Sequence, residues 1–155
     1  MKNRNILNTD HWETPLYLYE ELDQEFKFDF DPCPIMQKLT PETDGLLIDW
    51  GQVNFVNPPY SLKLKNQFVL RAIDFAKQGR TCVMLLPVST STKLFHDHIK
   101  PNAKEIRFIK GRVPFIGRNA IGEKRKNKTG MHDSMIVVFN GWTQVWLKCH
   151  SIFVW

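Results

Sequence analysis

The residues best suited to chemistry form the tetrapeptide Asn57-Pro58-Pro59-Tyr60, which directly follows an apolar stretch at residues 53–56. Each proline fixes its own φ angle and lacks an N–H group, and Pro58 also biases Asn57 toward an extended backbone. The tetrapeptide can therefore hold the Asn57 side-chain oxygen and the Pro58 carbonyl oxygen as two acceptors in fixed positions. The ring of Tyr60 offers a flat surface a short distance away.

Two acceptors beside a flat ring suit the exocyclic amino group of a planar substrate. Its two N–H groups would donate to the two oxygens while the substrate ring stacks on Tyr60. Drawing these protons toward oxygen makes the nitrogen lone pair more available for attack on an electrophilic methyl group, with no need for a metal. A nucleobase inside a duplex would have to be flipped out to reach such a site. An ordinary turn is the alternative, because Pro-Pro is also common in loops.

Positive charge is concentrated in one stretch of a chain whose net charge is +5. Residues 107–128 contain eight Lys and Arg residues and one acidic residue, Glu123. Such a surplus favours a polyanion, because cationic side chains release counterions from phosphates, although a solvated loop has the same composition. We expect residues 110–130 to form a basic loop or hairpin. Its candidate nucleic-acid contacts are Lys110, Arg112, Arg118, Lys124, Arg125, Lys126 and Lys128.

The 155 residues are 43% hydrophobic, with eleven Phe and five Trp, which predicts one soluble domain over residues 1–155 with a loose arm at residues 1–11. No window approaches the roughly 20 apolar residues of a membrane span, and Asp10 and Glu13 interrupt any apolar run of signal-peptide length. We therefore expect a cytoplasmic protein with no membrane partner. The oligomeric state stays open.

A metal site is not expected. The three cysteines, Cys33, Cys82 and Cys149, form no C-x-x-C pair, which argues against both a zinc knuckle and a disulfide framework. His96 and His98 are two positions apart, so they would point to different faces of a helix. Cys33 is best interpreted as a small buried residue rather than a nucleophile.

Helices and strands are expected to alternate along the chain, which predicts an α/β sheet with a parallel core. Thr14-Pro15 should open a helix, with Thr14 as the N-cap and Leu18, Leu22 and Phe26 on its buried face. A second helix is expected over residues 63–78 and a short one around residues 94–99. Expected strands cover residues 28–31, 46–48, 53–56, 81–86, 105–109 and 134–139, with a possible edge strand at 143–149. Ligands bind beyond the carboxyl ends of parallel strands, where Asp31-Pro32, Asp44 and Asn57 all fall.

The order of several short motifs resembles that of the phage-type DNA adenine methyltransferases that use S-adenosylmethionine. The resemblance extends from about Trp12 to Phe139 and is most specific at Asn57-Pro58-Pro59-Tyr60. The other motifs are Trp12-Glu13-Thr14-Pro15, Phe28-Asp29-Phe30-Asp31-Pro32-Cys33, Asp44-Gly45-Leu46-Leu47 with Asp49-Trp50, and Phe108-Ile109-Lys110-Gly111-Arg112.

The resemblance implies methyl transfer from S-adenosylmethionine to the exocyclic amino group of adenine in DNA. It implies a single-domain Rossmann-like methyltransferase sheet with a parallel core and an antiparallel C-terminal part, and a location in the host-cell cytoplasm. Asn57, Pro58, Pro59 and Tyr60 match the catalytic loop. The segment with Trp12, Thr14 and Pro15 matches the wall around the methionine end of the cofactor. Asp31 and Pro32 match the motif beside its amino-acid moiety, and Asp44, or Asp49 in its place, matches the residue that accepts from its adenine.

The sequence departs from the family pattern after residue 31. The glycine-rich turn usual after the first strand is replaced by Pro32-Cys33-Pro34, and no acidic residue clearly matches the one that holds the ribose. The cofactor site is therefore expected to be abbreviated. Two alternatives stay open: methylation of a glutamine amide in a protein, and a nucleic-acid-binding module without catalytic activity.

Overall fold

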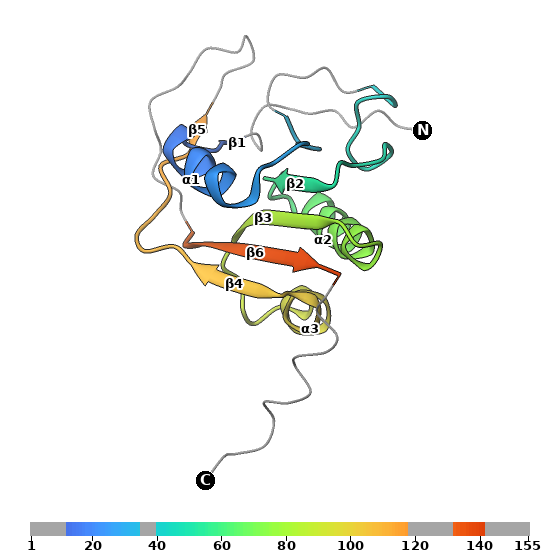
Figure 1. Ribbon diagram of the computed structural model, residues 1–155. Helices are drawn as coiled ribbons and strands as arrows, with labels where there is room; N and C mark the ends of the chain where they lie inside the picture. The colour runs from blue at the N-terminus through green and yellow to red at the C-terminus, as the bar shows by residue number, and fades with distance from the viewer. Residues whose placement is uncertain (1–11, 35–39, 118–131, 142–155) are drawn as a thin grey trace.

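The computed structural model describes residues 12–34, 40–117 and 132–141, and shows a four-stranded mixed sheet with helices on both faces (Figure 1). The strands are β2 (Val53–Val56), β3 (Thr81–Pro87), β4 (Glu105–Phe108) and β6 (Ser134–Asn140). They lie in the order β2-β3-β6-β4. The predicted α/β class is confirmed at this level.

The sheet is mixed, with one parallel and two antiparallel pairings between its four strands. β2 pairs in parallel with β3 through the crossover helix α2 (Leu62–Lys77). β6 is antiparallel to both β3 and β4, so β3 and β4 run in the same direction. The link between β3 and β4 contains η1 (Leu94–Ile99), which is a π-helix, and α3 (Lys100–Asn102). The expected antiparallel C-terminal part is present as β6, whereas the parallel ladder between the described strands is limited to β2 and β3.

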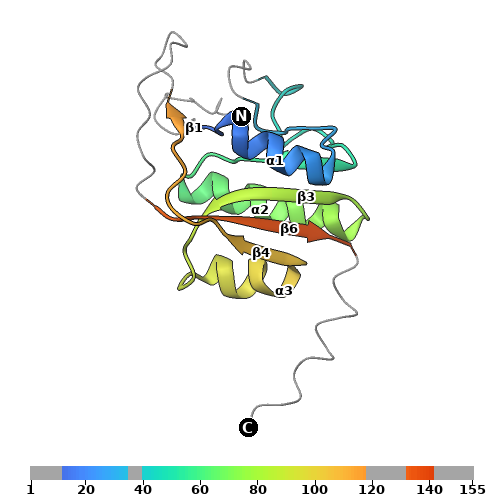
Figure 2. The ribbon, with the colours of Figure 1, turned by 60° about the vertical axis from the view of Figure 1, so that its left-hand side comes forward.

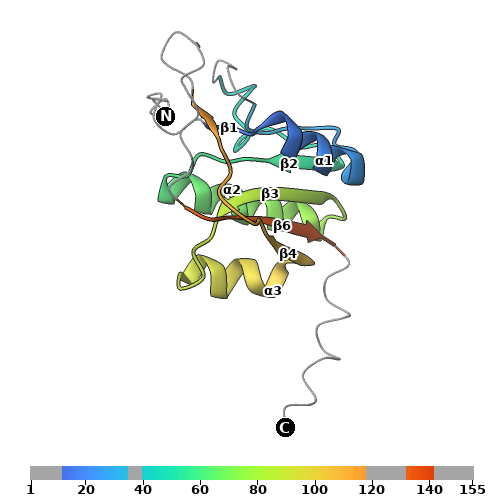
Figure 3. The ribbon, with the colours of Figure 1, turned by 90° about the vertical axis from the view of Figure 1, so that its left-hand side faces the viewer.

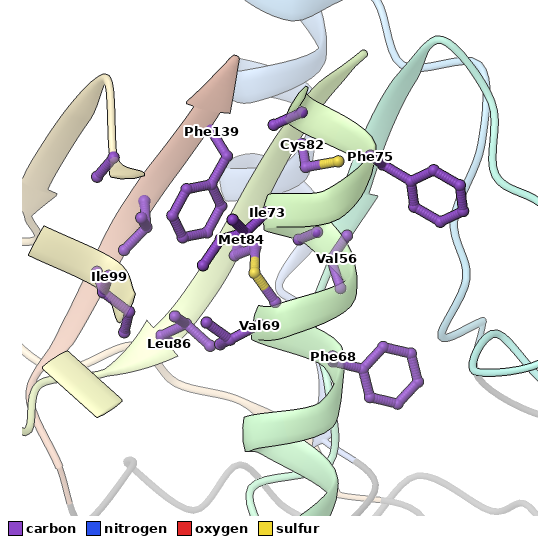
Figure 4. Packing of buried hydrophobic residues seen from close by; sticks show 14 of the residues in the cluster. Val56, Phe68, Val69, Ile73, Phe75, Cys82, Met84, Leu86, Ile99 and Phe139 are labelled. Carbon is purple, nitrogen blue, oxygen red and sulfur yellow. The ribbon is translucent and has the colours of Figure 1, made fainter. Parts of the chain in front are cut away.

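One hydrophobic core lies between the sheet and α2 (Figure 4). The continuous apolar run of β3 makes it a central strand, and its alternate residues Cys82, Met84 and Leu86 face this core. Helix α2 contributes a stripe of residues spaced three and four apart, as the sequence predicted. The stripe consists of Phe68, Val69, Ala72, Ile73 and Ala76.

A second core lies on the opposite face of the sheet, against α1 (Leu16–Phe26). It contains Leu18 and Leu22 of α1 together with Val83 and Leu85, the β3 residues that alternate with those of the first core. Figures 2 and 3 show α1 above β3, and α3 below β4. β3 is buried on both faces because the core with α2 covers one face and the core with α1 covers the other.

A small antiparallel pair stands beside the main sheet. β1 (Trp12–Glu13) pairs with β5 (Ile116–Gly117), placing Trp12 opposite Gly117. The expected loose arm at 1–11, most of the basic loop at 110–130 and the possible strand at 143–149 lie outside the described residues. None of the described helices is long and apolar enough to cross a membrane.

The prediction of a strand at residues 46–48 is wrong, because these residues belong to a hydrogen-bonded turn. The Leu47 and Ile48 N–H groups both donate to the Asp44 carbonyl oxygen, at 2.7 and 3.1 Å. The Asp44 carboxylate accepts from the Leu46 N–H at 2.9 Å, and the Trp50 indole donates to the Gly45 carbonyl at 2.7 Å. Local side-chain bonding of this kind competes with strand pairing.

Two other boundaries differ from expectation. The strand expected over 28–31 is reduced to one parallel bridge between Phe30 and Asn54. Helix α1 begins after Pro15, which occupies the N-cap position and makes no side-chain cap bond. Thr14 is therefore not the N-cap, and its hydroxyl is used elsewhere.

Candidate active site

A pocket of about 260 Å³ opens at the carboxyl end of β2. It brings together Thr14, Asp31 and Asn57, three residues that the sequence separated by up to 43 positions and assigned to one site. The full lining consists of Glu13, Thr14, Leu16, Tyr19, Asp31, Cys33, Pro34, Phe55 and Asn57. The pocket therefore has one apolar and aromatic wall and a few convergent polar groups, as small-molecule sites commonly do.

The Asn57 side chain is held by its nitrogen. Its Nδ2 donates to the Trp12 carbonyl oxygen at 2.7 Å and to the Thr14 hydroxyl at 3.0 Å. A carbonyl oxygen can only accept, so the amide must turn its NH₂ group toward Trp12. Within the described part of the chain, the buried Oδ1 of Asn57 accepts no hydrogen bond.

An unpaired buried acceptor destabilises a protein by about 1–3 kcal/mol. Oδ1 of Asn57 is such an acceptor, at the carboxyl end of a strand in a residue that lines the pocket. The oxygen therefore keeps an unused capacity to accept a hydrogen bond. The sequence predicts that this oxygen accepts from a substrate amino group, and that role stays a prediction.

Tyr60 is held at the other end of the tetrapeptide. Its hydroxyl donates a long hydrogen bond, 3.5 Å, to the Leu85 carbonyl oxygen, and its ring packs edge-to-face on Phe115 with centroids 5.9 Å apart. Burial raises the pKa of the Tyr60 phenol, so the group stays neutral at physiological pH. Tyr60 does not line the 260 Å³ pocket, and of the two prolines Pro58 is buried and Pro59 half-buried.

Asp31 supplies a carboxylate to the pocket. Burial raises its pKa to about 6, and the 2.7 Å hydrogen bond from the Cys33 N–H acts in the opposite direction. A buried carboxylate of this kind is stabilised by a cation, because an opposite charge favours the ionised form. The site could therefore hold a ligand with a positive group near Asp31.

The structure does not bring Asp44 or Asp49 to this pocket. Asp44 is buried, and its carboxylate accepts from the Leu46 N–H in the turn described above. Asp49 forms a two-bond ion pair with Arg80, at 2.8 and 3.0 Å, which lowers the pKa of the Asp49 carboxyl. Trp12 contributes its carbonyl oxygen to the site, while Pro15 and Pro32 are not among the lining residues.

The basic stretch is only partly described. Lys110 and Arg112 are exposed, and the Arg112 Nε lies 4.0 Å from the Asp133 Oδ1. Arg118, Lys124, Arg125, Lys126 and Lys128 lie outside the described residues. Arg107, from the same stretch of charge, binds both carboxylate oxygens of Glu25 at 2.6 Å and also pairs with Glu105 at 2.7 Å. This arginine ties β4 to α1 and is not a free cation.

Sequence reasoning missed Glu13 and Tyr19, which also line the pocket. Glu13 lies between Trp12 and Thr14, which were both predicted as site residues, so its place in the sequence could have identified it. Tyr19 packs edge-to-face on Phe55, with ring centroids 5.1 Å apart. Only the fold reveals this contact, because Tyr19 stands beside the buried stripe of α1 rather than in it.

No group of three or more His, Cys, Asp or Glu side chains in the described ranges is placed to hold a metal ion. Within the described residues Cys33 and Cys82 form no disulfide bond, and burial raises the pKa of Cys82 to about 12. Cys149 lies outside the described residues. His96 and His98 are exposed on η1.

Two sequence matches identify the family of the chain. Residues 3–152 match the family model for DNA N-6-adenine-methyltransferase (Dam). Over 142 residues the chain is 42% identical to a DNA N-6-adenine-methyltransferase of Haemophilus phage HP1 (strain HP1c1). The matched region covers 83% of this chain and 80% of the phage protein. No solved structure matches the chain. The family that the sequence motifs resembled is thus confirmed, and the chain belongs to the DNA N-6-adenine-methyltransferase (Dam) family.

Proposed function

We propose that the protein transfers a methyl group from S-adenosylmethionine to the exocyclic amino group of adenine in DNA. Family membership supports the adenine and DNA parts of this proposal. The observation that carries the chemistry is the buried Oδ1 of Asn57, which has no partner among the described residues while its Nδ2 is held by two acceptors. The same geometry supports Asn57, Pro58, Pro59 and Tyr60 as the catalytic loop.

The pocket residues fit one end of the proposed cofactor. Asp31 suits the ammonium or sulfonium charge of S-adenosylmethionine, and Tyr19, Phe55 and Leu16 suit its apolar parts. The volume of about 260 Å³ is below the usual range of about 300–1,000 Å³ for sites that enclose a whole ligand. We therefore assign the methionine end of the cofactor to this pocket, which agrees with an abbreviated site.

Catalysis in this proposal depends on position and electrostatics. Bound cofactor supplies an electrophilic methyl group. The Asn57 Oδ1 and the Pro58 carbonyl oxygen accept the two N–H groups of the adenine amine and hold its lone pair toward the methyl group. As the amine nitrogen gains positive charge, the same two oxygens stabilise it, and the released proton passes to water. The oxygens need no change of protonation state for this role.

The substrate base is expected to stack on Tyr60 after leaving the duplex. The contacts of Tyr60 with Leu85 and Phe115 hold its ring in one orientation, which suits a stacking surface. Phosphate contacts are assigned to Lys110, Arg112, Arg118, Lys124, Arg125, Lys126 and Lys128. A glutamine amide would also fit two acceptors, but the basic stretch and the family favour DNA.

The fold and location complete the proposal. β2, β3 and β4 run in the same direction, and β6 runs in the opposite direction between β3 and β4. This order supports an abbreviated Rossmann-like methyltransferase sheet in one domain over residues 1–155. The protein would act in the cytoplasm of the host cell, where it meets DNA.

The experiment compares Asn57→Ala with the wild type and with Asn102→Ala, whose side chain bonds the His98 carbonyl on the far side of the sheet. Methyl transfer to DNA should fall by about 10²–10³-fold in Asn57→Ala, by analogy with the loss of one transition-state hydrogen bond, and persist in Asn102→Ala. Calorimetry should still show cofactor and DNA binding in both variants.

Three results would contradict parts of this proposal. Retained turnover in Asn57→Ala would remove that residue from the mechanism. A wild-type protein that gives no heat with S-adenosylmethionine would support the inactive binding module. Labelled methyl appearing in protein rather than in DNA would support the glutamine alternative.

A further inference from the structure

The amide of Asn57 is oriented by a distant segment of the chain. Its two acceptors belong to residues 45 and 43 positions away, Trp12 and Thr14. Both receive their hydrogen bonds from the same nitrogen, so together they direct the opposite atom, Oδ1, away from this segment. The Trp12 acceptor is main chain, and the Thr14 acceptor is a side-chain hydroxyl.

The segment that holds the amide is fixed on both sides. Trp12 is paired with Gly117 across the β1–β5 ladder. Pro15, directly after Thr14, accepts from the N–H groups of Leu18 and Tyr19 at 3.1 and 3.2 Å, where α1 begins. Thr14 therefore sits between a strand pair and a helix start, and its hydroxyl has a defined position.

Thr14 does not do what its local sequence predicts. A threonine before proline at a helix start commonly caps the helix, yet Pro15 is the N-cap residue of α1 and no side-chain cap bond is made. The hydroxyl oxygen accepts from Asn57 Nδ2 at 3.0 Å instead. A long-range hydrogen bond to the tetrapeptide thus takes the place of a local one.

We infer that Thr14 is a positioning residue that holds the Asn57 amide with Oδ1 directed toward the substrate amine, an inference that rests on the proposed function. Without the hydroxyl, one N–H of the buried amide has no acceptor and the amide can turn about its last side-chain bond. An amide turned by 180° would direct NH₂ groups at the substrate amine and Oδ1 at the Trp12 carbonyl, where two acceptors repel each other. Thr14 acts on the rate through Asn57 and not by contact with the reacting atoms.

The test uses Thr14→Val, which keeps the shape of the side chain without the hydroxyl, and Thr14→Ser, which keeps the hydroxyl. The kcat of Thr14→Val at saturating cofactor and DNA should fall about tenfold, the effect of one unpaired buried donor. The Kd for S-adenosylhomocysteine should change much less than kcat. Thr14→Ser should recover most of kcat.

A second readout does not need turnover. Hydrogen exchange of the Asn57 side-chain NH₂, followed by NMR, should be slow in the wild type and in Thr14→Ser, and faster in Thr14→Val. Unchanged exchange in Thr14→Val would overturn the inference whether or not the protein methylates adenine. Faster exchange in a protein that transfers no methyl group would uphold the hydrogen bond and contradict the proposed function.

Two kinetic outcomes would also overturn the inference. A raised Kd with unchanged kcat in Thr14→Val would make Thr14 a part of the cofactor wall alone. Equal loss of kcat in Thr14→Val and Thr14→Ser would show that the hydroxyl is not the cause.

Discussion

Gly45 lies so close to Pro32 that a β-carbon at position 45 would be 2.1 Å from the Pro32 carbonyl oxygen. Two loops that are separate in the sequence are therefore in direct backbone contact. The Gly45 carbonyl also accepts from the Trp50 indole, and the Trp50 ring packs on Phe75 with centroids 4.9 Å apart. The loop that carries Asp31 is in this way supported by the core under α2.

Gly45→Ala should consequently disturb both stability and ligand binding. The added methyl group meets a carbonyl oxygen that cannot move without its backbone, so we expect a loss of about 1–3 kcal/mol in the free energy of unfolding. Calorimetry with S-adenosylhomocysteine should show weaker binding, because Pro32 adjoins Asp31. In Gly79→Ala no atom meets the new carbon within 4 Å, although φ is +90°. As the control, Gly79→Ala should lose about 1–2 kcal/mol in the free energy of unfolding, and its affinity for S-adenosylhomocysteine should not change. Equal affinity in Gly45→Ala and the wild type would contradict the contact.

The pKa of Asp31 makes stability depend on pH. Burial raises this pKa from 3.8 to about 6, so the folded state holds the proton more tightly than the unfolded state. The stabilising contribution of the protonated group is complete below about pH 4 and is lost as the pH rises through about 6. Asp31→Asn should therefore be more stable than the wild type at pH 7.5, by at most about 3 kcal/mol, and the difference should vanish near pH 4. Urea unfolding at the two pH values measures it, and a variant that is less stable at pH 7.5 would contradict the burial of this charge.

Ligand affinity should show the opposite pH dependence. A cationic ligand favours the ionised carboxylate, so the Kd of S-adenosylhomocysteine should fall as the pH rises from 5 to 7. Because the pKa of Asp31 is about 6, a rise of two pH units from 5 to 7 should lower the Kd by up to about tenfold. In Asp31→Asn the affinity should be lower at pH 7 and nearly independent of pH over this range. The same pH dependence in both proteins would remove Asp31 from the cofactor site.

Replacement of Lys124, Arg125 and Lys126 by alanine should weaken DNA binding for all sequences alike. Each lost phosphate contact removes about 0.9 from the slope of log K against log salt, so the slope should become shallower by up to about three. Arg107→Ala is the control, since Glu25 and Glu105 already neutralise this arginine. It should leave the salt slope unchanged. An unchanged slope in the triple variant would place the DNA surface elsewhere.

Much of the sheet could be predicted because its periodicity is strong. β3 is a continuous apolar run, and α2 repeats its apolar residues at helical spacing, so both were recognised. Residues 46–48 are equally apolar but form a turn, because the Asp44 carboxylate and the Trp50 indole bind that turn. Three apolar residues cannot by themselves distinguish a short strand from a packed turn.

The prolines beside Asn57 led to a prediction of its chemistry, which stays a prediction, whereas the groups that hold its side chain could not be predicted. Rotation of an amide depends on contacts in space, and those contacts come from Trp12 and Thr14 across 43 or more residues. Local rules gave Thr14 a capping role that the fold does not use. The same limit applies to Asp44, where a turn and a ligand contact share one sequence pattern.

The most direct measurement is a crystal structure of the protein with sinefungin and a DNA duplex that contains its target adenine. We predict an extrahelical adenine whose N6 lies about 3 Å from both the Asn57 Oδ1 and the Pro58 carbonyl oxygen. The amino-acid end of sinefungin should lie beside Asp31. An adenine or sinefungin bound away from the tetrapeptide, with the Asn57 oxygen still unpaired, would contradict this prediction.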